Sequence, residues 1–407
     1  MSRLSWTVDR LRHPGARDPL EERHATWLEL FFDVVFVLAL LGVTARLGTG
    51  GSPSPAQLGA AIGIYVLVYW SWLGQSIYDT RYDPDDTPHR LLVLTATLGA
   101  GAIALGVQHV PGGLLLPVGY LIVRGCLLVM YLRVLFADRS QRDLVSVYLT
   151  GFGTGWLLWA ASLAIPANLR PALWITGLGI ELLTPRLGRA QFARHPVHRT
   201  HLPERIGQFV IILLAATLTN LRDAVVGAHA HGRVLFAATA AFVLLASMWW
   251  TYTTYVSGGL AEPNLGDGQT YAYLNGPGGG AILFLGWALG VMVHRIGLST
   301  PLPVTTRVVL GGSVVTWMLV GTGLHRFALG GLPRQRALLG LGSTTLIIVA
   351  TLLAANPDLL LGLTTAILVG YAATVSPQIA RFRERRSATG QPPTRKSGTG
   401  GPGPERR

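Results

Sequence analysis

Charged residues are scarce in this chain. Asp, Glu, Lys and Arg make up 13% of its 407 residues, about half the share of an average soluble domain. Hydrophobic residues account for 50% of the chain, and the mean hydropathy is +0.43. A chain of this length with so little charge does not fit an ordinary soluble protein, and its composition predicts a polytopic membrane protein.

Lysine and cysteine are nearly absent. Lys396 is the only lysine and Cys126 the only cysteine, so an intramolecular disulfide is excluded. The formal net charge of +13 therefore comes from arginine. In so apolar a chain, this charge predicts loop arginines that face anionic lipid, and not a nucleic-acid-binding surface.

Motifs of soluble enzymes are also missing. The chain contains no phosphate loop Gly-x-x-x-x-Gly-Lys, no His-Glu-x-x-His and no Gly-x-Ser-x-Gly. Three histidines between His195 and His201 stand beside prolines at a spacing of three, which is a poor ligand geometry without a cysteine partner. We therefore predict no metal and no cofactor, and an enzyme is the least favoured class of function.

Long apolar runs are abundant instead. A hydrocarbon core of about 30 Å needs about 20 helical residues, and windows of that length recur near 27–47, 56–78, 90–110, 113–136, 143–166, 168–184, 206–226, 233–256, 270–293, 303–324, 335–355 and 358–380. Strands of a barrel would be shorter and alternating. The runs predict an all-α transmembrane bundle of about twelve helices, in which the two windows within 143–184 are the weakest.

Arginine alternates between the loops that join these runs. Loops such as 137–142 and 185–204 are rich in arginine, whereas 48–55 and 108–112 carry almost none. The bias predicts a multi-pass protein of the bacterial inner membrane with both termini in the cytoplasm, including the segment 1–24. The tail 381–407 is basic and rich in Gly, Pro, Ser and Thr, which predicts disorder.

A faint repeat divides the chain into halves at 25–184 and 205–380, joined by the cytoplasmic linker 185–204. Glu-Arg precedes the first and the seventh window, and Tyr69-Trp-Ser-Trp72 is echoed by Met248-Trp-Trp-Thr-Tyr252. Both offsets are near 180 residues. Six helices per unit would give two parallel repeats with a site at their interface, as in many transporters. Chance similarity between short aromatic stretches is the alternative.

The first apolar run contains two carboxylates. Glu29 and Asp33 are four residues apart and share one helix face, and ionisable residues in a spanning helix point to function. A proton-sharing pair would suit proton-coupled transport or acid–base chemistry. We expect Asp33 to be buried and Glu29 to lie at the interface. The alternative is that both reach the cytoplasm and pair with Arg23 or His24.

An acidic segment follows the second run and would enter the membrane on the same side. It could share one vestibule with the carboxylate pair, or it could be a solvated loop that caps the third helix. Its spacing does not match a calcium loop. The candidate polar residues of this segment are Asp79, Asp83, Asp85, Asp86, His89 and Arg90.

Two further features lie inside apolar runs. Arg124 is near mid-depth of the fourth run and must face a partner or water, and we expect that partner to be Asp33. The stretch Gly276-Pro-Gly-Gly-Gly280 lies inside the ninth run. It predicts either a broken helix that exposes backbone to a cavity or close packing of small residues.

Four sequence blocks together resemble the bacterial low temperature requirement protein A family. The resemblance extends over most of residues 20–380 and implies a polytopic inner-membrane protein named for growth in the cold, without implying a mechanism. The blocks are Glu22-Arg-His-Ala-Thr-Trp-Leu-Glu-Leu-Phe-Phe-Asp33-Val-Val-Phe-Val, Tyr69-Trp-Ser-Trp72, Tyr82-Asp-Pro-Asp-Asp-Thr-Pro-His-Arg90 and His201-Leu-Pro-Glu-Arg-Ile-Gly-Gln-Phe-Val-Ile-Ile212.

The second half departs from the family pattern at three positions. Ala216, Thr254 and Asn275 stand where the family usually has glutamate, aspartate and histidine. The first half therefore holds most of the ionisable groups within the predicted membrane. A mechanism that needs acids or histidine in both halves is not favoured for this chain.

Two functions fit these features. The first is a transporter or permease for an unidentified small solute or ion, with a polar site around Asp33 that faces the cytoplasm. The second is a non-transporting membrane scaffold or a stress-linked accessory protein, which the neutral positions of the second half favour. In either case the bilayer is the partner that the composition predicts.

Overall fold

The computed structural model describes residues 26–82, 86–198, 200–228, 232–256, 268–329 and 331–388. Within these ranges the chain is helical and contains no strand. The α-helices are α2 (Trp27–Ala45), α3 (Pro55–Arg81), α4 (Thr87–Gly106), α5 (Leu115–Ala137), α6 (Arg142–Ser162), α7 (Arg170–Leu187), α8 (Arg189–Arg194), α9 (His201–Gly227), α10 (Gly232–Val256), α11 (Gln269–Gly297), α12 (Val304–Leu329), α13 (Arg334–Leu353) and α14 (Pro357–Ala388).

Each predicted apolar window coincides with one of these helices, and the prediction of an all-α polytopic bundle is confirmed. In the described part of the chain, 11 helices are long and apolar enough to cross a membrane. Helix α7 is not among them, and it comes from the weaker pair of windows. It contains a glutamate, two prolines and two arginines in 18 residues, which lowers its hydropathy.

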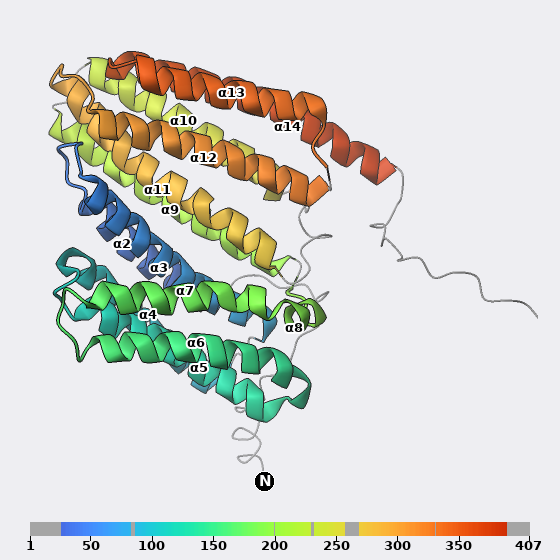
Figure 1. Cartoon of the computed structure of the whole chain (residues 1–407). Coiled ribbons are helices and arrows are strands. Elements are labelled where there is room, and N and C mark those ends of the chain that lie inside the picture. The colour runs from blue at the N-terminus through green and yellow to red at the C-terminus, as the bar shows by residue number, and fades with distance from the viewer. Residues whose placement is uncertain are drawn as a thin grey trace, which may run out of the picture.

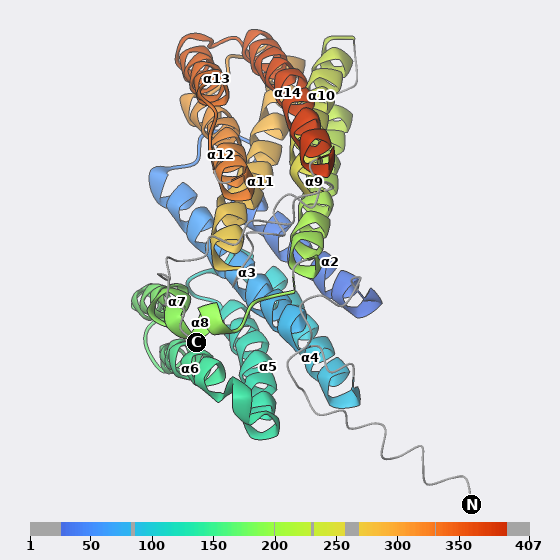
Figure 2. The same ribbon diagram turned by 90° about the vertical axis from the view of Figure 1, so that its right-hand side faces the viewer.

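The helices form two groups that lie side by side (Figures 1 and 2). Helices α2–α7 make the first group and α9–α14 the second, and α2 and α3 contact α9 and α11 between them. Both groups begin at the end of the bundle where α8 lies, which we call the α8 end; the opposite end is the far end. The first helices of the two groups therefore run in the same direction, as parallel repeats require. The repeat itself stays a prediction.

Local sequence signals explain where several helices start. Thr26 and Glu29 form a capping box at α2, and Ser54 and Gln57 form another at α3. The side chain of Asp86 accepts a hydrogen bond from the backbone of the first turn of α4. Such caps satisfy amide groups that have no partner inside the helix.

Helix α11 is continuous through the glycine-rich stretch Gly276–Gly280, so the predicted break is wrong and the packing alternative is confirmed. A Cβ on Gly276 would lie 2.9 Å from the Tyr69 ring, and one on Gly280 would lie 3.0 Å from the Tyr65 ring. The Tyr69 hydroxyl donates to the Ala272 carbonyl (2.9 Å), and the Tyr65 hydroxyl donates to the Gly276 carbonyl. The missing side chains allow α3 to approach the backbone of α11 closely.

Another close approach joins α4 to α5, and it gives a first prediction. A Cβ on Gly119 would lie 2.8 Å from the Ile103 amide nitrogen, so Gly119→Val should force the helices apart. We expect a loss of about 1–3 kcal/mol of stability from overpacking, seen as a lower melting temperature in detergent. Gly101→Val is the matched control, because a Cβ there meets nothing within 4 Å. Equal melting temperatures for the two variants would refute the prediction.

Candidate functional site

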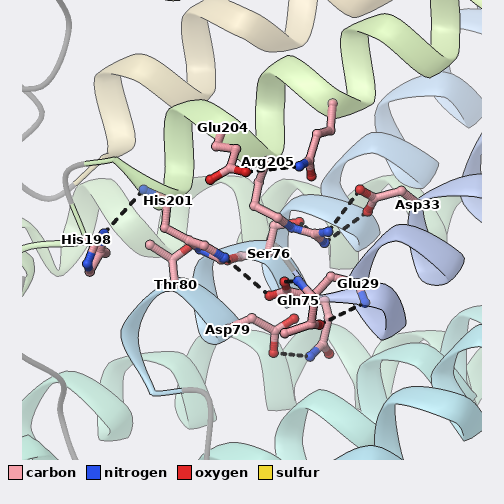
Figure 3. Close-up of polar contacts among 12 residues, drawn as sticks. Glu29, Asp33, Gln75, Ser76, Asp79, Thr80, His198, His201, Glu204 and Arg205 are labelled. Carbon is pink, nitrogen blue, oxygen red and sulfur yellow. Dashed lines mark hydrogen bonds and ion pairs between the residues drawn. The ribbon is translucent and has the colours of Figure 1, made fainter. Parts of the chain in front are cut away.

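The central feature of the site is a buried ion pair between the two helix groups (Figure 3). Asp33 on α2 and Arg205 on α9 are both 0% exposed. The Arg205 Nη1 donates to Asp33 Oδ2 at 2.9 Å, and its Nη2 lies 2.9 Å from Oδ1. This bidentate arrangement gives the contact geometric specificity as well as charge complementarity.

Helix α3 completes the surroundings of this pair. The Trp72 indole Nε1 donates to Asp33 Oδ1 at 2.7 Å, and Arg205 Nη2 donates to Ser76 Oγ at 3.4 Å. The Trp72 ring also stacks on Phe209 of α9, with centroids 4.1 Å apart. Side chains from α2, α3 and α9 thus converge on one desolvated carboxylate.

Glu29 lies one turn closer to the α8 end and is also buried. Its exposure is 5%, so Glu29 is enclosed by protein as Asp33 is, and its position at the membrane interface stays a prediction. Its Oε1 lies 3.5 Å from His201 Nε2, and His201 Nδ1 lies 3.1 Å from the Thr80 hydroxyl (Figure 3). Glu29 and Asp33 therefore both face α9 and both meet a basic residue there. Arg23 and His24 lie outside the described residues.

The acidic segment after α3 is partly described. Gln75 donates to Asp79 Oδ1 at 2.8 Å, and His89 Nε2 lies 3.5 Å from the same oxygen. Asp86 caps α4 by accepting from the His89 amide (2.8 Å), and it also pairs with Arg133. These contacts agree with a capping role for Asp86.

The remaining residues of the segment do not decide between the alternatives. Arg90 is exposed on α4, and Asp83 and Asp85 lie outside the described residues. The shared vestibule stays a prediction.

The expected Arg124–Asp33 pair is wrong. Arg124 on α5 pairs with Glu181 on α7 at 2.7 Å, and both side chains are 0% exposed. Its Nη2 also donates to the Trp70 carbonyl at 3.1 Å, and its guanidinium lies 4.8 Å from the Phe152 ring centroid. Arg124 thus turns into the first helix group, whereas Asp33 faces the second.

The sequence pointed to Glu29, Asp33 and Arg124 but did not identify the residues that pair with them. Arg205 and Glu181 carried a usable signal, because each is ionisable and lies at or within an apolar window. His201 was assigned to a linker, although the helix begins there. Trp72 stood out only as part of an aromatic block, and its bond to Asp33 was not predictable because an indole in a membrane helix is equally common as packing. Within the described ranges, no three His, Cys, Asp or Glu side chains are grouped so that they could hold a metal ion.

A vestibule of about 500 Å³ lies toward the far end of the same helices. Polar groups line it, namely Thr44 of α2, Asn220 and Asp223 of α9 and His294 of α11. Asp33 and Thr44 are eleven residues apart, or about 16 Å along α2.

Close packing lies between the vestibule and the ion pair. A Cβ on Gly286 of α11 would lie 2.7 Å from the Thr217 side chain of α9. The Thr217 hydroxyl bonds to the Leu213 carbonyl of its own helix (3.0 Å).

Comparison with known proteins identifies the family. Residues 24–373 match the bacterial low temperature requirement A protein (LtrA) family. The chain belongs to this family. Its membership and its apolar helices together make it an integral membrane protein.

A curated relative adds no function. An uncharacterized protein of Rhizobium meliloti (strain 1021) is 28% identical over 257 residues, which cover 58% of this chain and 60% of the relative. The chain thus matches less than two thirds of that relative's length. No solved structure matches the chain significantly.

The structure brings together the blocks by which the sequence resembles the LtrA family. Asp33 comes from the first block, Trp72 from the second and Arg205 from the fourth. Two of the positions that depart from the family pattern bond within their own helices: Asn275 donates to the Tyr271 carbonyl at 2.9 Å, and Thr254 donates to the Trp250 carbonyl at 2.7 Å.

Proposed function

We propose that this protein is a transporter or permease in which the Asp33–Arg205 pair is the closed gate at the α8 end. One observation carries the proposal. The ion pair joins the two helix groups at one end of α2 and α9, while a vestibule lined by several polar side chains lies toward the other end of the same helices. The interface between the two helix groups is thus closed at the α8 end and hollow toward the far end. This arrangement fits alternating access, in which the two groups rock against each other.

The chemistry of the pair suits a gate. A buried ion pair adds little net stability compared with apolar packing, but it becomes costly when one partner is lost. Protonation of Asp33, or arrival of a charged solute, would leave Arg205 without its counter-charge and favour separation of α2 from α9. The distribution of arginine predicts that the α8 end faces the cytoplasm.

Cysteine accessibility tests the gate without knowledge of the solute. In a Cys126→Ser background, Asn220→Cys reports on the vestibule and Ser76→Cys on the gate. While Asp33 is intact, we expect a membrane-impermeant maleimide to label only Asn220→Cys, and only when it is added at the far end. Adding Asp33→Asn should raise labelling of Ser76→Cys from the α8 end severalfold and lower labelling of Asn220→Cys. Without the ion pair, the two helix groups can separate at the α8 end and close at the far end.

The control for this experiment is Asp358→Asn, which removes an acid that pairs with Arg233 on the surface. It should leave both labelling patterns unchanged. If Asp33→Asn changes neither site although the protein remains folded, the pair is not a gate.

A second candidate is a non-transporting scaffold or stress-linked accessory protein. The observation that favours it is the bracing of Asp33 by Trp72 and of Arg205 by Ser76, which suits a permanent clamp as well as a gate. Fixed accessibility of the two cysteine sites, together with one stable partner in crosslinked membranes, would support this function.

A further inference from the structure

A second hollow lies on the side of the molecule, between the two helix groups. It has a volume of about 550 Å³ and is lined by α3 and α7 of the first group and by α11 and α12 of the second. Its lining is mostly apolar, and Ile62 and Val308 at its edges are 46% and 52% exposed. In a membrane-spanning bundle, such edges face hydrocarbon. We call this hollow the lateral groove.

The groove is long as well as apolar. Along α3 its lining extends from Leu58 to Leu73, which is about 22 Å of helix. This length exceeds half of a hydrocarbon core of about 30 Å. On α3 the groove begins about 12 Å from the α8 end and extends to within one turn of the far end. An acyl chain that enters beside Tyr273 from the α8 end would therefore follow the groove through the middle of the bilayer.

Small residues create the space, and the two tyrosine hydroxyls of the wall are already hydrogen-bonded. Gly276, Gly280 and Gly312 line the groove without side chains. The hydroxyls of Tyr65 and Tyr69 donate to α11 carbonyls, so their rings present apolar surface. An occupant needs no hydrogen bonds to these groups, which suits hydrocarbon better than a polar solute.

A positive charge lies beside the groove toward the α8 end. The ring of Tyr273 forms part of the wall, and its hydroxyl donates to the Leu182 carbonyl at 2.6 Å. The exposed Arg186 guanidinium lies 5.2 Å from the centroid of the same ring. Arg186 is thus held where the headgroup of a lipid would lie if the acyl chain of that lipid followed the groove.

We propose that the lateral groove binds an anionic phospholipid from the leaflet at the α8 end, with an acyl chain in the groove and the phosphate at Arg186. The volume lies in the usual range for ligand sites. The charge complements an anionic headgroup. This site is separate from the ion pair and does not depend on the proposed transport function.

Native mass spectrometry of the full-length protein in detergent tests the site. Phosphatidylglycerol and phosphatidylcholine are added in equal amounts, and the lipid that stays bound is measured. We expect one phosphatidylglycerol to be retained preferentially. Gly312→Leu should reduce retention at least fivefold, because a Cβ there meets nothing within 4 Å and the leucine would fill the groove. Arg186→Gln should abolish the headgroup preference while a lipid still binds.

Matched controls separate this site from ordinary annular lipid. Gly342→Leu places the same side chain on exposed α13, where a Cβ also meets nothing within 4 Å, and Arg139→Gln removes an exposed arginine at the α8 end. Both should retain phosphatidylglycerol like the unmodified protein. Equal retention of both lipids, or equal losses in Gly312→Leu and Gly342→Leu, would overturn the proposal.

A second measurement does not depend on how well the variants fold. Phosphatidylglycerol with a photoreactive group in its acyl chain should crosslink the unmodified protein at peptides of α3 and α12, and excess unlabelled phosphatidylglycerol should suppress the reaction. Crosslinking spread evenly over α13 and α14 would also overturn the proposal.

Discussion

Arg205→Met is expected to lower the free energy of unfolding by about 3–5 kcal/mol, the usual cost of removing one partner from a buried ion pair. The carboxylate of Asp33 would keep the Trp72 indole as a donor but lose its counter-charge in a site with no exposure. It must then be buried as an unpaired anion or take up a proton. We expect a clear drop in melting temperature and in the amount of protein that accumulates in the membrane.

A second substitution separates charge from packing. Asp33→Asn combined with Arg205→Met removes both charges and leaves an oxygen that accepts from Trp72. The double variant should recover most of the lost stability, because burying two neutral side chains avoids the desolvation penalty. Arg222→Met is the matched control on the same helix, since its partner Asp223 is exposed and surface pairs contribute about 0–1 kcal/mol.

The double variant also distinguishes stability from function. A protein with neutral residues at both positions should be stable and yet fail as a gate, because no charge remains that a proton or a solute could separate. If Arg205→Met proves as stable as Arg222→Met, the pair does not hold the two helix groups together in the membrane, and the basis of the proposed gate is lost.

The fold was largely predictable from the sequence because the bilayer imposes one simple rule. A spanning segment must be about 20 residues long, apolar and helical, so each window became a helix. Helix α7 shows where the rule weakens. Glu181, Pro185 and Arg186 reduce its hydropathy, and its place in the bundle depends on the partner that Glu181 finds on α5.

The candidate site was predictable only in part. Spacing placed Glu29 and Asp33 on one face of α2, and the structure confirms that both face α9. The partner of Asp33 was not predictable, because hydropathy gives the depth of a residue but not the direction in which its side chain points. Arg124 and Asp33 both lie inside apolar runs, yet they face different neighbours. Arg205 lies just before its apolar window, where the sequence alone suggests an arginine that anchors the helix end at the membrane interface.

The glycine-rich stretch of α11 shows a related limit. Gly276 to Gly280 lower helix propensity, which favoured a break as much as close packing. The decisive information lies more than 200 residues away, in the aromatic rings and hydroxyls of Tyr65 and Tyr69. Local propensity could not show that α3 would fill the space and bond to the carbonyls of α11.

Removing one charge from the Arg124–Glu181 pair inside the first helix group should lower the free energy of unfolding as much as removing Arg205. Glu181→Gln is expected to cost about 3–5 kcal/mol, because it removes the counter-charge of Arg124 while retaining an oxygen for the Tyr120 hydroxyl. The weakened element should be α7, because its low hydropathy makes its place in the bundle depend on contacts with α5 and α6. Proteolysis of α7 and the melting temperature in detergent would both report the loss.

Arg124→Met in the Glu181→Gln background should restore most of this stability, since neither charge then remains in the core. Recovery would show that the cost comes from the unpaired guanidinium and not from the new amide. A double variant that is less stable than Glu181→Gln alone would contradict this explanation. It would point instead to the bond from Arg124 to the Trp70 carbonyl as the main contribution.

Gly74 provides an independent test of where the Arg124 guanidinium lies. A Cβ at Gly74 would overlap Nη1 of Arg124 and lie 3.0 Å from Leu127, so Gly74→Ala should destabilise by about 1–3 kcal/mol. Gly63→Ala on the same helix meets nothing within 4 Å and should be neutral or slightly stabilising, because alanine favours helix by about 0.5–1 kcal/mol over glycine. The cost of Gly74→Ala should shrink once Arg124 is methionine, since a flexible thioether can move aside where a paired guanidinium cannot. An unchanged cost in that background would place the clash at Leu127, and the Arg124–Glu181 pair would then not be what requires glycine at this position.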